Sequence, residues 1–225
     1  MPELPSGALE DPLAVAQLLC TRLCHDLAGP VGAVAAGVEL TAGDPAQVDA
    51  ETLALIGNSS AAASRKLKFL RVAMGLPPAL PSGLADMRSL VEGFLQATAG
   101  RSGVPALGWP SPADMSAASE RIGPQTVPLI LNLCLLVVEA QPACRMLGLT
   151  VAAGHRVSVT VDGQGDATRI AAWRPDILAS IAGTSTAPGA KTIQAHVTAI
   201  LAARAGGRLT LSAAGPGLAA TFDGT

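Results

Sequence analysis

The chain has 225 residues, of which 49% are hydrophobic, 14% are charged and 2% are aromatic, and its formal net charge is −2. That length accommodates one large domain or two small ones. The lack of a basic surface and of stacking rings argues against nucleic-acid partners. The longest apolar run, residues 127–138, is shorter than the roughly 20 residues that a membrane span needs, so we expect no membrane partner either.

The start of the chain and its cysteines bear on location. The first residues, MPELPSGALEDP, carry acids and prolines where a signal peptide has basic residues, so we expect a flexible segment over 1–10 and no signal peptide. The four cysteines show no paired CxxC spacing, which favours reduced thiols over disulfides or a metal site. These features predict a cytoplasmic protein.

The first predicted helix covers residues 11–42, with Asp11 as its N-cap and Pro12 in its first position. Apolar residues recur along it every three or four positions and predict a buried stripe. The stripe consists of Val15, Leu19, Leu23, Leu27, Val31, Val34 and Val38. A turn at 43–47 then ends the helix.

The second predicted helix covers residues 46–75, and a proline-rich segment at 75–83 ends it. Its apolar stripe consists of Leu53, Ile56, Leu67, Leu70 and Met74. Two helices joined by a tight turn predict an antiparallel hairpin. Because one hairpin cannot bury two apolar stripes, we expect a homodimer in which two hairpins form a four-helix bundle.

After the proline-rich segment, predicted helices alternate with predicted strands. The expected elements are a helix at 84–100, a buried helix at 124–142, two strands at 146–154 and 155–163, a helix at 188–205 and a β-hairpin at 206–222. Such a mixture predicts an α/β or α+β layer domain. With the helical hairpin in front of it, the whole chain is expected to be α+β.

Within the first helix, His25 lies on a different face from the apolar stripe. It is about 200° around the helix from Leu23 and from Leu27. Its helical neighbours are almost all small: Ala14, Leu18, Thr21, Ala28, Gly29, Gly32 and Ala36. Pro30 removes the helix hydrogen bond to the Asp26 carbonyl and is expected to bend the helix. A projecting imidazole on so flat a surface is accessible to a large partner.

The imidazole of His25 is a candidate nucleophile. An unperturbed imidazole has a pKa of about 6.5 and is therefore mostly neutral near pH 7. Asp26 can hold the ring or accept the proton of Nδ1, as carboxylates do beside other catalytic histidines. The alternative is a surface histidine on a structural helix.

Positive charges of the second helix are expected close to His25. In an antiparallel hairpin, residues near 63 lie level with it, and the sequence there contains Arg65 and Lys66. These cations could bind a phosphoryl group or steer an acidic partner, and Arg22, one turn before His25, could do the same. The alternative is a solvated basic face.

These motifs resemble a known family. CHDLAGP, residues 24–30, resembles the H-box of two-component histidine kinases, in which His is followed by an acidic residue and, five positions on, by Pro. The order of SRKLKFLRVAMG, LILNLCLLVVEAQP, RPDILASIAG and IQAHVTAILAARAGGRL after it resembles the ChpT-type histidine phosphotransferases of alphaproteobacterial phosphorelays. This resemblance covers residues from about 11 to 222.

The resemblance implies a domain organisation. Residues 11–76 would form the dimerisation and phosphotransfer hairpin, and 77–83 a linker. Residues 84–225 would form a degenerate Bergerat-type domain, similar to the ATPase domain of histidine kinases but without ATP binding.

The resemblance also implies roles for single residues and for partners. His25 matches the phosphorylated residue, Asp26 its acidic neighbour and Pro30 the kink, whereas Gly29 stands where Asn, Thr or Ser is common. Phosphate would arrive from the receiver domain of a hybrid histidine kinase and leave to the receiver domains of response regulators.

The nucleotide-binding motifs of histidine kinases are eroded. Asn132 matches the first asparagine of the N-box, but Leu136 stands where the second, magnesium-binding asparagine is expected. Gly189 is the sole glycine where a glycine-rich turn would hold phosphates. We therefore expect no bound cofactor or metal, with Mg²⁺ carried only by the receiver. The alternative functions are a soluble sensorless histidine kinase, or a non-catalytic dimeric scaffold or kinase inhibitor.

Overall fold

The computed structural model describes residues 11–43, 49–75, 84–99, 103–111, 113–114, 126–153, 157–165, 171–184 and 188–224. Three sequence predictions lie outside the described residues, namely the flexible segment at 1–10, most of the turn at 43–47 and the linker at 77–83. No helix of the described part is both long and apolar enough to cross a membrane.

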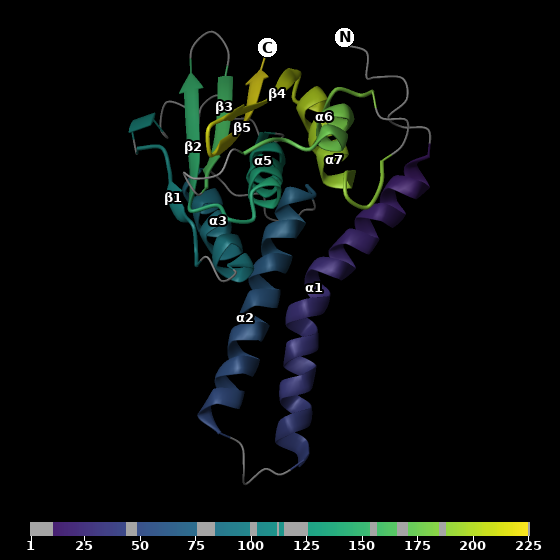
Figure 1. Ribbon diagram of the computed structural model, residues 1–225, viewed down its shortest axis with the longest axis vertical. Helices are drawn as coiled ribbons and strands as arrows, with labels where there is room; N and C mark the ends of the chain where they lie inside the picture. The colour runs from purple at the N-terminus through teal and green to yellow at the C-terminus, as the bar shows by residue number, and fades with distance from the viewer. Residues whose placement is uncertain are drawn as a thin grey trace.

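Two long helices form an antiparallel hairpin that projects from the rest of the molecule (Figure 1). α1 spans Pro12–Gly43, and Asp11 caps it as predicted, because its Oδ1 accepts a hydrogen bond from the Leu13 N–H at 2.9 Å. α2 spans Ala50–Ala73. It begins later than the predicted residue 46, because Asp49 is its N-cap and accepts a bond from the Thr52 N–H at 2.7 Å.

The two helices of the hairpin pack closely at one glycine. A Cβ atom added to Gly37 would lie 2.5 Å from Cγ1 of Ile56, so a larger residue there would push α2 away from α1. α1 is bent part-way along its length (Figure 1), and Pro30 lies inside it. A proline inside a helix is the commonest cause of such a bend, as the sequence predicted.

The rest of the chain forms a mixed sheet with helices. In chain order the elements are α3 (Leu84–Thr98), β1 (Ala106–Gly108), α5 (Thr126–Ala140), β2 (Met146–Ala153), β3 (Val157–Gln164), α6 (Pro175–Ile181), α7 (Ile193–Arg204), β4 (Gly207–Ala214) and β5 (Gly217–Gly224). The strand order is β1-β2-β3-β5-β4, parallel between β1 and β2 and antiparallel elsewhere. The predicted α+β class is therefore confirmed.

Two elements were absent from the sequence prediction. β1 has three residues, which is too few to show the alternation typical of a strand. α6 has seven residues, and Arg174 at its N-cap makes no side-chain capping bond, so the usual start signal is missing.

The core is built around α5, which contacts strands β3 and β5 on one side and α2 and α7 on others (Figure 1). Asn132 is completely buried in the middle of this helix. Its Nδ2 donates to the Ala73 carbonyl at 2.6 Å and to the Pro128 carbonyl at 2.7 Å, and its Oδ1 accepts a bond from Gln194. The elements from α3 to β5 are called the body below. The Asn132 amide joins the end of the hairpin to α5 and α7, and so fixes where the hairpin leaves the body.

Part of the predicted apolar stripes is exposed in the single chain. Val31 and Val38 of α1 are 55% and 49% exposed, and Leu53 and Leu67 of α2 are 57% and 48% exposed. Leu67 is about 200° around α2 from Arg65, whose side chain contacts α3. Leu67 therefore lies on the side of α2 that faces away from α3.

Candidate functional site

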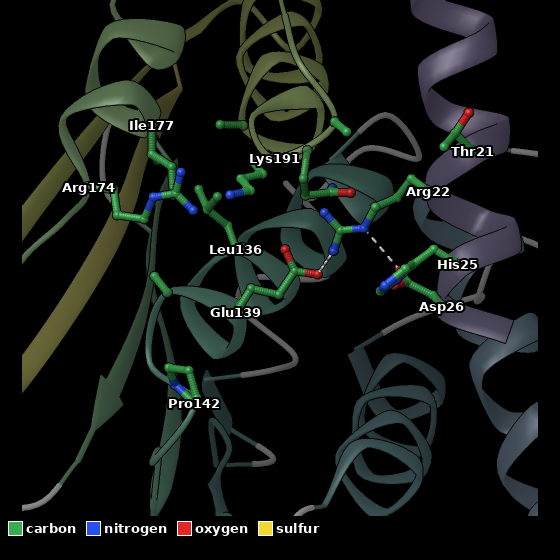
Figure 2. Close-up of a pocket in the computed structure, with 14 residues that line it drawn as sticks. Thr21, Arg22, His25, Asp26, Leu136, Glu139, Pro142, Arg174, Ile177 and Lys191 are labelled. Atoms are coloured by element: carbon green, nitrogen blue, oxygen red, sulfur yellow. Dashed lines mark hydrogen bonds and ion pairs between the residues drawn. The ribbon is translucent and has the colours of Figure 1, made fainter. Parts of the chain in front are cut away.

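His25 projects from α1 as the sequence predicted. Its side chain is 86% exposed, and its Nδ1 lies 3.2 Å from Oδ1 of Asp26 (Figure 2). A carboxylate at that distance accepts a hydrogen bond from Nδ1–H, and this tautomer leaves the lone pair on Nε2. The arrangement presents an oriented, solvent-exposed nitrogen nucleophile.

Arg22 holds Asp26 from the other side. Its Nε donates to Oδ2 of Asp26 at 3.0 Å, and its Nη2 forms an ion pair with Glu139 of α5 (Figure 2). Burial alone would lower the pKa of Arg22, but the charges of Glu139 and Asp26 outweigh burial and raise it. Arg22 therefore bridges two carboxylates, and the four side chains form a continuous line from α5 to His25.

Lys66 occupies the place that Pro30 leaves open. Pro30 has no N–H, so the Asp26 carbonyl lacks its helical donor. The Nζ of Lys66 donates to this carbonyl at 3.2 Å. The sequence correctly placed Lys66 level with His25, and the structure shows that its ammonium group binds the backbone of α1.

A pocket of about 640 Å³ opens beside these residues. Its wall includes His25 and Asp26 of α1, Glu139 of α5, Arg174 before α6 and Lys191 before α7. Arg174 lies across the pocket from His25 (Figure 2) and is paired with Asp176, whose pKa it lowers. Lys191 is exposed. The pocket is thus bordered by α1 on one side and by cations of the body on the other.

Glu139 has a perturbed ionisation equilibrium. Desolvation raises its pKa from the usual 4.5 to about 7, and the nearby charge of Arg22 opposes this rise. The Asp26 carboxylate adds to the rise. Glu139 therefore changes charge near neutral pH, at the far end of the line that reaches His25.

The other residues singled out from the sequence take different positions. Arg65 points to α3, since a Cβ atom on Gly93 would lie 3.6 Å from its Cγ, and its role in steering a partner stays a prediction. Gly29 has open space where a side chain would begin.

The sequence prediction missed Glu139, Arg174 and Lys191. For Glu139 a signal was present, because it is the charged residue that directly follows the apolar run 127–138. No local pattern marked Arg174 or Lys191, whose side chains reach the pocket only through the folding of the body.

The positions that match kinase nucleotide motifs are engaged within the fold. Asn132 is bound as described above, and Leu136 is 2% exposed. The N–H of Gly189 donates to Oγ1 of Thr192 at 2.9 Å, and the Gly189 carbonyl accepts the N–H of Ile193 at 2.9 Å. Among the described residues, no group of three or more His, Cys, Asp or Glu is arranged to hold a metal ion.

Comparison with known proteins places the chain in a family. Residues 84–217, more than half of the chain, match the family model of the histidine phosphotransferase C-terminal domain. The chain belongs to this family. The solved structure of a bacterial phosphotransferase is similar over 94% of this chain and 97% of that chain, with a TM-score of 0.73 and 23% identity, and shows the same fold.

A curated relative supports the resemblance noted in the sequence. The protein phosphotransferase ChpT of Brucella abortus (strain 2308) is 43% identical over 63 residues. These residues are 28% of this chain and span 29% of the length of the Brucella protein. Together with the family match, this confirms the resemblance to ChpT-type histidine phosphotransferases.

The bond between Lys66 and the carbonyl left free by Pro30 can be tested by a double-mutant cycle. Lys66→Met keeps the apolar stem and should lower the free energy of unfolding by about 1 kcal/mol, the usual contribution of such a bond. In a Pro30→Ala background the new N–H of residue 30 supplies the donor, so the same change should cost far less. Urea denaturation of the four proteins measures both steps.

Lys68→Met is the matched control, because Lys68 is exposed on the same helix and should tolerate the change. Equal losses for Lys66→Met in the two backgrounds would contradict the proposed bond.

Proposed function

We propose that this chain is a histidine phosphotransferase of a two-component phosphorelay, in which His25 receives a phosphoryl group from one receiver aspartate and passes it to another. The observation that carries the proposal is the orientation of His25. Asp26 binds its Nδ1, and the rest of the ring is exposed at the edge of a large pocket. Membership of the histidine phosphotransferase family supports it.

The reaction that this geometry favours is an in-line displacement. The Nε2 lone pair of His25 attacks the phosphorus of an aspartyl phosphate, an N–P bond forms, and the P–O bond to the aspartate breaks. The electron pair of that bond leaves with the aspartate carboxylate. The positive charge that develops on the ring is stabilised by the Asp26 carboxylate, which accepts a hydrogen bond from Nδ1–H throughout. The return step to a second aspartate reverses these bond changes.

Positioning accounts for most of the catalysis in this proposal. Phosphoryl transfer needs little covalent help from the protein, and the barrier falls when the reacting atoms are held in place. Arg22 holds the Asp26 carboxylate and Lys66 holds the Asp26 carbonyl, so the backbone and the side chain beside His25 are both fixed. A large exposed surface with small neighbours leaves room for a receiver domain.

The partners belong to the proposal as well. A receiver domain has an acidic phosphorylation site, and the exposed Lys191 gives the opposite wall of the pocket a complementary charge. We propose the receiver of a hybrid histidine kinase as donor and response-regulator receivers as acceptors, all in the cytoplasm. The engagement of Asn132 and Gly189 within the fold supports a protein rather than ATP as the source of phosphate, and a degenerate ATPase-like role for the body.

We also propose that the chain works as a homodimer. Val31, Val38, Leu53 and Leu67 are exposed on the hairpin, and we propose that a second hairpin covers them to complete a four-helix bundle. His25 lies on another face of α1, which borders the pocket. Dimerisation through the apolar residues would therefore leave both phosphorylation sites accessible.

Replacing His25 tests the nucleophile. His25→Gln should fold normally, with a change in the free energy of unfolding below about 0.5 kcal/mol, because the side chain is exposed. It should accept no label from a receiver domain carrying [³²P]phosphate on its aspartate. The wild-type label should be stable in alkali and lost in acid, as expected of a phosphoramidate. A labelled His25→Gln protein would contradict the assignment.

Changing one exposed apolar residue tests the dimer. Val38→Glu should convert a dimer into a monomer, because it places a charge in the proposed helix–helix contact. Leu40→Glu is the matched control, since Leu40 is 68% exposed but lies about 200° around α1 from Val38. Sedimentation equilibrium at micromolar concentration measures both. A monomeric wild-type protein would overturn this part of the proposal.

A further inference from the structure

Glu139 has no role in the transfer step described above, although it lies in the same pocket. We infer that Glu139 is a positioning residue for phosphoryl transfer: its carboxylate, acting through Arg22 and Asp26, holds the His25 ring and strengthens the grip of Asp26 on the Nδ1 proton. This inference rests on the proposed function of His25. It adds a residue from the body to a site that otherwise belongs to the hairpin.

The geometry connects the two ends directly. Glu139 pairs with Nη2 of Arg22, Nε of Arg22 lies 3.0 Å from Oδ2 of Asp26, and Oδ1 of Asp26 lies 3.2 Å from Nδ1 of His25. The side chain of Arg22 is only 15% exposed, so its guanidinium is held between the two carboxylates and is not free in solvent. A change at Glu139 therefore reaches His25 through three contacts, with Arg22 and Asp26 in between.

The charges explain how Glu139 would act. One guanidinium shared by two carboxylates neutralises each only in part. Asp26 then keeps enough negative charge to bind Nδ1–H strongly and to stabilise the ring as it becomes positive. If Glu139 loses its charge, Arg22 pairs with Asp26 alone and withdraws that charge from the imidazole.

The surroundings of Glu139 make its charge sensitive to pH. The charged and titratable groups that line the pocket with it are Arg22, Asp26 and His25 from α1, Arg174 from the segment before α6 and Lys191 from the segment before α7. Desolvation in this pocket raises the pKa of Glu139 to about 7. As the pH falls through this value the carboxylate is protonated, so its support of His25 is lost on the acidic side and present on the alkaline side.

The same shift separates a positioning role from a structural one. A carboxyl group whose pKa is raised by folding binds its proton more tightly in the native state, so its contribution to stability falls as the pH rises from about 4.5 to about 7. At pH 8 the charged Glu139 does not favour the folded state. Glu139→Gln should therefore leave the urea midpoint at pH 8 unchanged or higher, while transfer slows.

The experiment compares initial rates of labelling from a [³²P]phospho-receiver domain between pH 5.5 and 8.5. Glu139→Gln should slow transfer about fivefold at pH 8, lower kcat with little change in KM, and remove the part of the wild-type pH profile that is centred near 7. Glu139→Asp, which keeps the charge, should restore most of the rate.

Glu92→Gln is the matched control, because Glu92 forms an exposed ion pair with Arg88 within α3, away from the pocket. It should keep the wild-type rate and profile. A Glu139→Gln protein with the wild-type rate and the wild-type profile would overturn the inference while leaving the role of His25 intact. Failure of the wild-type protein itself to take up label would instead overturn the proposed function.

Discussion

The bridge that Arg22 makes between Asp26 and Glu139 determines where His25 lies relative to the body. An isolated ion pair on a surface contributes little, because water and salt screen it. This bridge differs in two ways: the guanidinium is mostly buried, and its fork binds one carboxylate on its own helix and one on α5. Through these contacts, the packing of α5 beside α1 fixes the orientation of the His25 imidazole.

The first helix serves three purposes that compete with one another. It packs against α2, it exposes the apolar residues Val31 and Val38, and it carries the proposed phosphorylation site His25 on a different face. Pro30 costs the helix a hydrogen bond, and Lys66 supplies a substitute donor to the Asp26 carbonyl. The small residues around His25 contribute little packing and leave its surface open. Pro30 and the small residues therefore lower the stability of the helix, and in return they leave the His25 ring accessible.

Much of the fold followed from periodicity and capping in the sequence. Asp11, Pro30 and the three- and four-residue spacing of apolar positions predicted α1, its bend and the outward direction of His25. The late strands followed from alternation. β1 and α6 could not be predicted in this way, because segments of three and seven residues are too short to show a helical or strand periodicity.

The site was predictable only in its local part. Asp26 is adjacent to His25, and the level of Lys66 follows from counting along an antiparallel hairpin. Arg65 is one residue before Lys66, so it lies about 100° around α2 and points toward α3. Counting residues along the hairpin gives the level of a residue but not this direction. Glu139 is 117 residues from Arg22 in the chain, and only the packing of α5 beside α1 brings them together. Contacts between distant segments depend on the tertiary fold, so they cannot be predicted from local patterns in a single sequence.

The central claim is that Asp26 occupies Nδ1 of His25 and leaves Nε2 to carry the phosphoryl group. Long-range ¹H–¹⁵N correlation spectra of the ¹⁵N-histidine-labelled protein, recorded before and after phosphorylation by a phospho-receiver, distinguish the two ring nitrogens. The account predicts a protonated Nδ1 in both states and a phosphorus-coupled Nε2 in the second. Phosphorus coupling at Nδ1, or at a histidine other than His25, would contradict it.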